Sequence, residues 1–90
     1  MAGMETTLFR ATIVLHGRLA DLLGRRFEIH APAQSSIAEL RRRIAVEHPA
    51  ASDAILGARI RACVGDAIVP DSYRPAPGET VEFLPPVSGG

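Results

Sequence analysis

Apolar and polar residues alternate along residues 8–15, which read "LFRATIVL". Alternation at a period of two is typical of a strand with one buried face. The apolar positions of this strand are Phe9, Ala11, Ile13 and Leu15. Similar patterns predict strands at 25–31, 59–64 and 67–69, and a last strand after Gly78 in which Phe83 faces inward and Glu82 outward.

One segment instead has helical periodicity, "SSIAELRRRIAVEHP". Its apolar stripe consists of Ile37, Leu40 and Ile44. Ser36 and Glu39 have the spacing of a capping box, in which each side chain binds the other's backbone N–H. Pro49 ends the helix, since proline cannot donate the next backbone hydrogen bond. This is the clearest helix in the chain.

Shorter signals separate the predicted strands. "GRLADLLG" predicts a short helical turn that ends at Gly24. Residues 50–58 carry no pattern and are expected to form a loop or irregular turn. Gly65-Asp66 predicts a two-residue hairpin of the type that places glycine first. Pro70 ends the short strand after it, and Pro77-Gly78 is a type II turn pair.

The order is therefore strand, short helix, strand, long helix and three more strands. This order favours an α+β β-grasp fold: a mixed sheet of about five strands packed on one main helix, with the first and last strands parallel at its centre. A ferredoxin-like sandwich would need a second full-length helix. We expect a polar leader at 1–7, one domain at 8–84 and an extended tail at 85–90.

Composition limits the function classes. Ten basic residues, all arginine, balance ten acidic ones, so nothing in the charge favours a nucleic acid or an anionic membrane as partner. Cys63 is the only cysteine, which excludes an intrachain disulfide and is typical of a reducing compartment. Residues 1–7 lack the features of a secretory signal, and no apolar run reaches membrane-spanning length. We expect a cytoplasmic protein.

Few residues look able to carry chemistry within the chain. His16, His30 and His48 lack metal-ligand spacing, and no glycine-rich loop precedes a helix, so we expect no bound metal, nucleotide or other cofactor. The run Arg41-Arg42-Arg43 is either a solvated helix face or a docking patch for an acidic partner. The chain alone is not expected to be a catalyst.

The last residues, "FLPPVSGG", are more specific. Gly89 and Gly90 have no Cβ, so this segment could enter a channel too narrow for other residues. Pro85-Pro86 favours an extended conformation, and six residues would reach about 19 Å. A terminal carboxylate at Gly90 is a poor electrophile until a partner uses ATP to form an acyl-adenylate, which a sulfur donor could then attack.

These residues resemble the ubiquitin-like sulfur carriers, above all the MoaD family, the small subunit of molybdopterin synthase. The ending "PGETVEFLPPVSGG" is similar to the family's "DGDEVAFFPPVxGG", and "LHGRLADLLG" to its "FAxxREL-x-G". The resemblance covers residues 8–90, and the tail is its most specific part. His16, Ala20 and Gly65 depart from the family pattern, at an aromatic, an arginine and an asparagine position.

The resemblance implies a mechanism. A ubiquitin-activating-type (MoeB-like) enzyme would adenylate Gly90, sulfuration would give a thiocarboxylate, and the tail would enter the large subunit (MoaE-like). Sulfur would then pass to cyclic pyranopterin monophosphate in molybdenum cofactor biosynthesis. The implied partner-binding residues are Phe83, in an apolar docking surface, and Pro85, Pro86, Val87, Ser88 and Gly89, in the inserted tail.

Other readings remain open. A sulfur carrier could instead serve the synthesis of cysteine or thiazole, or the thiolation of tRNA. Thiazole carriers usually lack the double proline. A protein modifier, or an interaction module without sulfur chemistry, would use the same scaffold.

Overall fold

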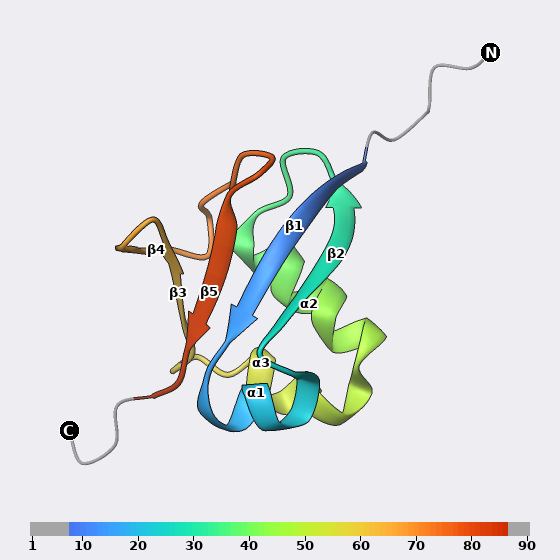
Figure 1. The fold of residues 1–90 in the computed structure, drawn as a ribbon, viewed down its shortest axis with the longest axis vertical. Helices are drawn as coiled ribbons and strands as arrows, with labels where there is room; N and C mark the ends of the chain where they lie inside the picture. Colours follow the sequence, from blue (N-terminus) through green and yellow to red (C-terminus); the bar gives the residue numbers. More distant parts are fainter. Residues whose placement is uncertain (1–7, 87–90) are drawn as a thin grey trace.

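Five strands form one mixed sheet in the order β2-β1-β5-β3-β4 (Figure 1). The computed structural model describes residues 8–86, and the expected leader and the tail residues Val87, Ser88, Gly89 and Gly90 lie outside that range. The strands are β1 (Leu8–Leu15), β2 (Arg26–Pro32), β3 (Arg61–Val64), β4 (Ala67–Val69) and β5 (Thr80–Leu84).

The first and last strands lie side by side and parallel, with Thr12 opposite Thr80 and Leu15 opposite Phe83. β2 pairs antiparallel with the outer edge of β1, and β3 pairs antiparallel with the other edge of β5. β5 is thus hydrogen-bonded on both sides. Because β1 and β5 run in the same direction, the start of α1 and the segment after Leu84 lie at the same end of the sheet (Figure 1).

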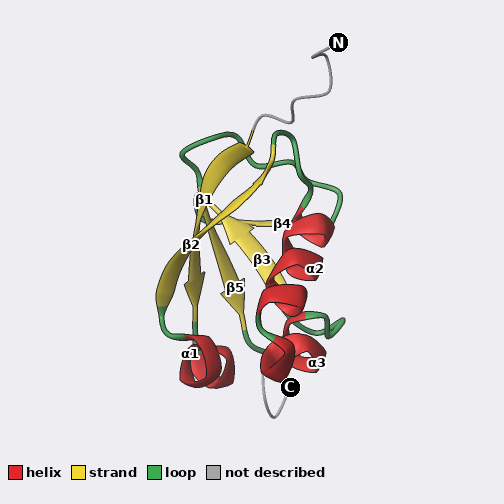
Figure 2. Cartoon of the chain, turned by 90° about the vertical axis from the view of Figure 1, so that its right-hand side faces the viewer, coloured by secondary structure: helices red, strands yellow, loops and turns green. Residues whose placement is uncertain are grey.

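Helices cover one face of the sheet. They are α1 (Gly17–Leu23), α2 (Ile37–Glu47), the 3-10 turn η1 (Pro49–Ala51) and α3 (Ser52–Ile55). Figure 2 shows α2 and α3 along one side of the sheet and α1 at its lower end, while the opposite face is uncovered. None of the helices within residues 8–86 has the length and apolarity needed to cross a bilayer.

The alternating pattern sets which side chains reach the core. Ala11, Ile13 and Leu15 of β1 are buried, as are Val81 and Phe83 of β5. The stripe of α2 packs against them, and all three of its members are inaccessible to solvent: Ile37, Leu40 and Ile44. These predictions are confirmed.

The predicted capping box is present at the start of α2. Ser36 Oγ accepts a hydrogen bond from the Glu39 backbone N–H at 3.2 Å, and Glu39 Oε1 accepts one from the Ser36 N–H at 2.7 Å. The pKa of the Glu39 carboxyl is lowered, because the backbone N–H of Ser36 and, to a smaller extent, its hydroxyl stabilise the ionised form. The helix ends at Glu47, before Pro49, as expected.

The structure corrects two local predictions. Residues 50–58 are not simply irregular: η1 and α3 occupy part of them, and Ala51 and Ile55 are buried. The hairpin at Gly65-Asp66 has positive φ at both residues, 55° and 70°, which is the mirror-image type I′ turn rather than the turn with only its first residue in that region. The type I′ turn matches the right-handed twist of strands joined by two residues.

The arrangement is an α+β β-grasp fold. Within residues 8–86, α2 is the one helix longer than seven residues, so the second long helix of a ferredoxin-like sandwich is absent from this part of the chain. This topology determines where the tail begins. Because β5 is the central strand, the segment after it starts from the middle of the sheet rather than from an edge.

Candidate functional site

The segment that leaves β5 begins with Pro85 and Pro86, both exposed to solvent. Pro85 lies beside Gly17, the first residue of α1: a Cβ at Gly17 would be 3.6 Å from Cβ and Cγ of Pro85. Gly17 also has a φ of 59°, a conformation that glycine adopts without steric cost. The base of the tail is therefore held between a doubly paired strand and the start of α1.

Phe83 does not form part of a docking surface. Its side chain is fully buried, two residues before the tail begins, so the expected contact of this side chain with a partner is wrong. The cause is strand alternation, which turns Phe83 toward α2 and its neighbours Glu82 and Leu84 toward the opposite face. Phe83 instead anchors the end of β5 in the core.

Arg41 of α2 holds this end of the molecule together. Its guanidinium lies over the Phe83 ring, with Cζ 5.6 Å from the ring centroid. Nη1 donates to the carbonyl oxygens of Ile55 and Gly57, at 3.2 and 3.0 Å, and Nη2 donates to that of Ile60. Because these carbonyls belong to the last residue of α3 and to the segment between α3 and β3, Arg41 fixes the segment that leads into the sheet beside β5.

Arg41 also makes an electrostatic contact with Asp71. Its Nε lies 3.2 Å from Asp71 Oδ1, an ion-pair distance, but the two groups are not aligned for a hydrogen bond. Asp71 is more than half exposed, so solvent screens much of this attraction. The hydrogen bonds to the carbonyls are the main contribution of Arg41.

The arginine run is thus not one surface. Arg41 is buried, and only Arg42 and Arg43 remain at the surface of α2. Arg43 Nε donates to the His30 carbonyl at 2.7 Å. Both arginines line a cleft of about 590 Å³ that also contains Arg74 and two carboxylates, so its charge is mixed. Docking of an acidic partner there stays a prediction.

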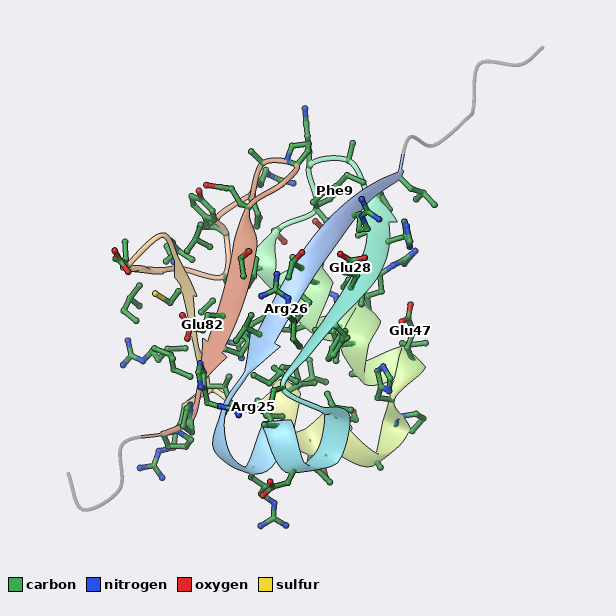
Figure 3. The ribbon with its side chains drawn as sticks, viewed as in Figure 1. Phe9, Arg25, Arg26, Glu28, Glu47 and Glu82 are labelled. Atoms are coloured by element: carbon green, nitrogen blue, oxygen red, sulfur yellow. The ribbon has the colours of Figure 1, made fainter. Side chains whose placement is uncertain are left out.

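The uncovered face carries a row of residues in register across all five strands. From β2 to β4 the row is Arg26, Val14, Glu82, Cys63 and Ile68. Arg26 and Glu82 are labelled in Figure 3. Leu84 follows on the same face of β5, at the start of the tail. This surface, which we call the open face, combines apolar side chains with a few charges.

Sequence reasoning missed the open face as a site. Its residues occupy the outward positions of the predicted strands, where polar residues are usual, yet Val14, Cys63, Ile68 and Leu84 are apolar. Ile68 is 54% exposed. Apolar residues at outward positions beside the tail were the available signal.

The three histidines lie on different parts of the fold. His16 Nε2 contacts Glu82 Oε2 on the open face, and the His48 ring packs on Phe27 with centroids 5.6 Å apart. His30 is an exposed residue of β2. Within residues 8–86 no three His, Cys, Asp or Glu side chains gather as a metal site would require.

The sequence model of the ThiS family matches residues 13–90. The chain belongs to this family. The match covers the last residues of β1, every later helix and strand, and the segment after β5. None of the curated proteins compared with the chain matches it.

Solved structures show the same fold. The small archaeal modifier protein 1 of Haloferax volcanii is 19% identical, with a TM-score of 0.75 over 88% of this chain and 99% of that one. A putative subunit 1 of molybdopterin converting factor from Pyrococcus furiosus is also 19% identical, with a TM-score of 0.74 over 88% and 99%. These likenesses establish the ubiquitin-like architecture.

A third similar structure is a complex. Subunit 1 of the Helicobacter pylori molybdopterin-converting factor, solved together with subunit 2, is 20% identical with a TM-score of 0.62 over 91% of this chain and 100% of that one. In that structure subunit 1 is in a complex with subunit 2. The chain described here therefore has the fold of the ubiquitin-like sulfur carriers.

Proposed function

We propose that this protein is a sulfur carrier and the small subunit of a molybdopterin synthase. Gly90 is adenylated by a ubiquitin-activating-type (MoeB-like) enzyme that supplies the ATP site, and is then converted to a thiocarboxylate. The tail delivers the sulfur to cyclic pyranopterin monophosphate in the large (MoaE-like) subunit. The chain itself needs no bound metal or cofactor for this role.

The observation that best supports the proposal is the origin of the tail. β5 is paired on both sides, Phe83 is locked in the core, and Pro85 lies against Gly17. An extended segment that starts from so fixed a point loses little further freedom when a partner encloses it. A stiff double proline followed by Val87, Ser88, Gly89 and Gly90 suits insertion into a narrow site.

The chemistry balances without any residue of the folded domain. The Gly90 carboxylate attacks the α-phosphate of ATP, releasing pyrophosphate and giving an acyl-adenylate. An equivalent of sulfide then attacks the carbonyl carbon, and AMP leaves with one former carboxylate oxygen. After the thiocarboxylate sulfur bonds to the substrate, water cleaves the acyl–sulfur bond and regenerates the carboxylate. Each cycle supplies one sulfur atom, so a dithiolene needs two.

The open face is the surface proposed to meet the large subunit. Val14, Cys63 and Leu84 are partly buried and apolar, and they lie beside the point where the tail leaves. An apolar patch with a polar surround is a typical protein interface. The tail and the open face together would form one continuous contact.

A protein modifier is the second candidate, since the fold is also that of the small archaeal modifier protein 1. Both roles begin with the same acyl-adenylate and differ in the acceptor: sulfide in one case, a lysine amine in the other. Carriers for cysteine, thiazole or tRNA thiolation differ in the final acceptor. The double proline, in "FLPPVSGG", favours the molybdopterin pathway over thiazole synthesis.

The test reconstitutes the pathway. The protein is incubated with ATP, its adenylating enzyme and a sulfide source, and then with the large subunit and cyclic pyranopterin monophosphate. We expect molybdopterin to form in proportion to the thiocarboxylate consumed. A variant lacking Gly90 is the control and should give none. Thiocarboxylate that forms but is passed only to another acceptor, or lysine conjugates in place of thiocarboxylate, would overturn the assignment.

A further inference from the structure

A second hollow lies beside the tail, on the helix-covered side of the sheet rather than the open face. This cleft of about 320 Å³ has Pro85 and Pro86 as one wall. Ala54, Gly57 and Ala58, at the end of α3 and after it, line the opposite wall. We call it the tail cleft.

The floor of the tail cleft is apolar and the rim is charged. Leu19 and Ile60, both core residues, line the floor. Arg18, Arg59 and Asp53 are exposed at the rim, and no ion pair involving any of them occurs among residues 8–86. The rim therefore has two positive charges and one negative charge around an apolar floor.

We propose that the protein that receives the tail inserts an apolar side chain, flanked by a carboxylate, into the tail cleft. This inference rests on the proposed function. A site that encloses the tail must surround Pro85 and Pro86 on both sides: the open face meets the partner on one, and the tail cleft meets it on the other. A surface that bridged the cleft without filling it would leave a void and forgo its contacts.

The expected carboxylate on the partner follows from the positive charges of Arg18 and Arg59 at the rim. Arg18 and Arg59 would be partly desolvated once the partner covers the rim, and an acidic group there would offset that cost. The apolar group would pack between the ring of a tail proline and the Ala58 side of the cleft. In this way the partner would clamp the first residues of the tail while the later ones reach its active site.

The experiment fills the cleft. Ala58 is exposed, so Ala58→Trp should fold normally while its indole occupies the hollow. The matched control is Ala76→Trp, also exposed, in the loop before β5 and thus at the opposite end of that strand from the tail. Thermal unfolding verifies that both variants are folded. Affinity for the large subunit is measured by calorimetry, and sulfur transfer is measured alongside.

We expect Ala58→Trp to bind the large subunit at least about tenfold more weakly than the wild type, and Ala76→Trp to bind equally well. Arg59→Glu should also weaken binding severalfold, more at low salt, whereas Arg42→Glu on α2 should not. The comparison is repeated with residues 87–90 removed from the wild type and from the Ala58→Trp variant. The loss of affinity caused by Ala58→Trp should persist, because the contact involves the folded domain.

Three results would overturn the inference. Ala58→Trp could bind as tightly as Ala76→Trp while the wild type binds and transfers sulfur normally, which would refute the clamp and leave the proposed function intact. The loss could vanish once residues 87–90 are removed, which would assign the cleft to the chain's own tail. Ala58→Trp could instead alter self-association in sedimentation, which would assign it to a second copy. A wild type that neither binds nor transfers sulfur refutes both proposals.

Discussion

The guanidinium of Arg41 lies over the ring of Phe83, with Cζ 5.6 Å from the ring centroid. This contact joins the one long helix of residues 8–86 to the strand that carries the tail. The same guanidinium donates to the carbonyls of Ile55, Gly57 and Ile60, so one side chain links α2 and β5 to the end of α3 and to the segment that leads into β3. The end of β5 is therefore fixed from below by the core and from both sides by its neighbouring strands.

Arg41→Met should strongly destabilise the fold. Methionine keeps the length of the side chain but has no donors, so the buried carbonyls of Ile55 and Ile60 lose their partner. We expect the free energy of unfolding to fall by about 3 kcal/mol, measured by urea denaturation. Arg42→Met on the same helix removes an exposed charge and should change it by no more than about 0.5 kcal/mol. If the two variants lost equal amounts of unfolding free energy, the stabilising role assigned to the hydrogen bonds of Arg41 would be contradicted.

Ser36→Ala should weaken the start of α2. The Glu39 backbone N–H loses its acceptor, and losing an N-terminal cap of this kind lowers the free energy of unfolding by about 1 kcal/mol. The exposed Ser72→Ala, in the loop after β4, is the control and should have little effect. A Ser36→Ala variant as stable as the wild type in denaturant titration would show that the capping box contributes nothing.

The contribution of the Ser36–Glu39 capping box to the free energy of unfolding should depend on pH. The pKa of Glu39 is lowered in the folded protein, so its ionised form stabilises the fold above the pKa of the unfolded chain. That contribution should disappear as pH falls through the folded pKa. Glu39→Gln keeps an acceptor but cannot titrate. It should be less stable than the wild type at neutral pH, and the difference should shrink below about pH 4.5. A difference that grows in acid would contradict this sign.

Leu84→Thr should weaken binding to the large subunit by about tenfold, as expected for an apolar residue near the centre of an interface. Threonine keeps the strand propensity, so stability should change little. Leu8→Thr, at the far end of the open face, is the matched control and should bind normally. Protection of the Cys63 thiol from alkylation by bound large subunit gives an independent reading. Unchanged affinity and no protection would place the interface elsewhere.

Much of the fold could be predicted because local patterns and packing agree. Residues 8–15 carry an apolar residue at every second position, and the structure buries all four of these inward positions: Phe9, Ala11, Ile13 and Leu15. Ser36 and Glu39 form the capping box that their spacing predicts. The strand follows from the alternation of its own residues, and the two members of the capping box lie three residues apart along the chain.

The features that the sequence did not predict depend on contacts between residues far apart along the chain or on segments too short to show a pattern. Arg41 looked like one of three surface arginines, and it is buried because carbonyls fourteen to nineteen residues away accept its hydrogen bonds. Residues 49–55 form helical segments of three and four residues, too short to show a period. The open face and the tail cleft depend on which strands become neighbours. The sequence pattern alone does not contain that information.

The central claim is that the work of this protein is done by a free carboxylate at Gly90. The most direct measurement is the intact mass after incubation with ATP, the adenylating enzyme and a sulfide source. We predict that the wild type gains the difference between one sulfur and one oxygen atom, and that a variant with one alanine added after Gly90 keeps its mass. If the extended variant were sulfurated and supported molybdopterin synthesis as well as the wild type, the claim would be contradicted.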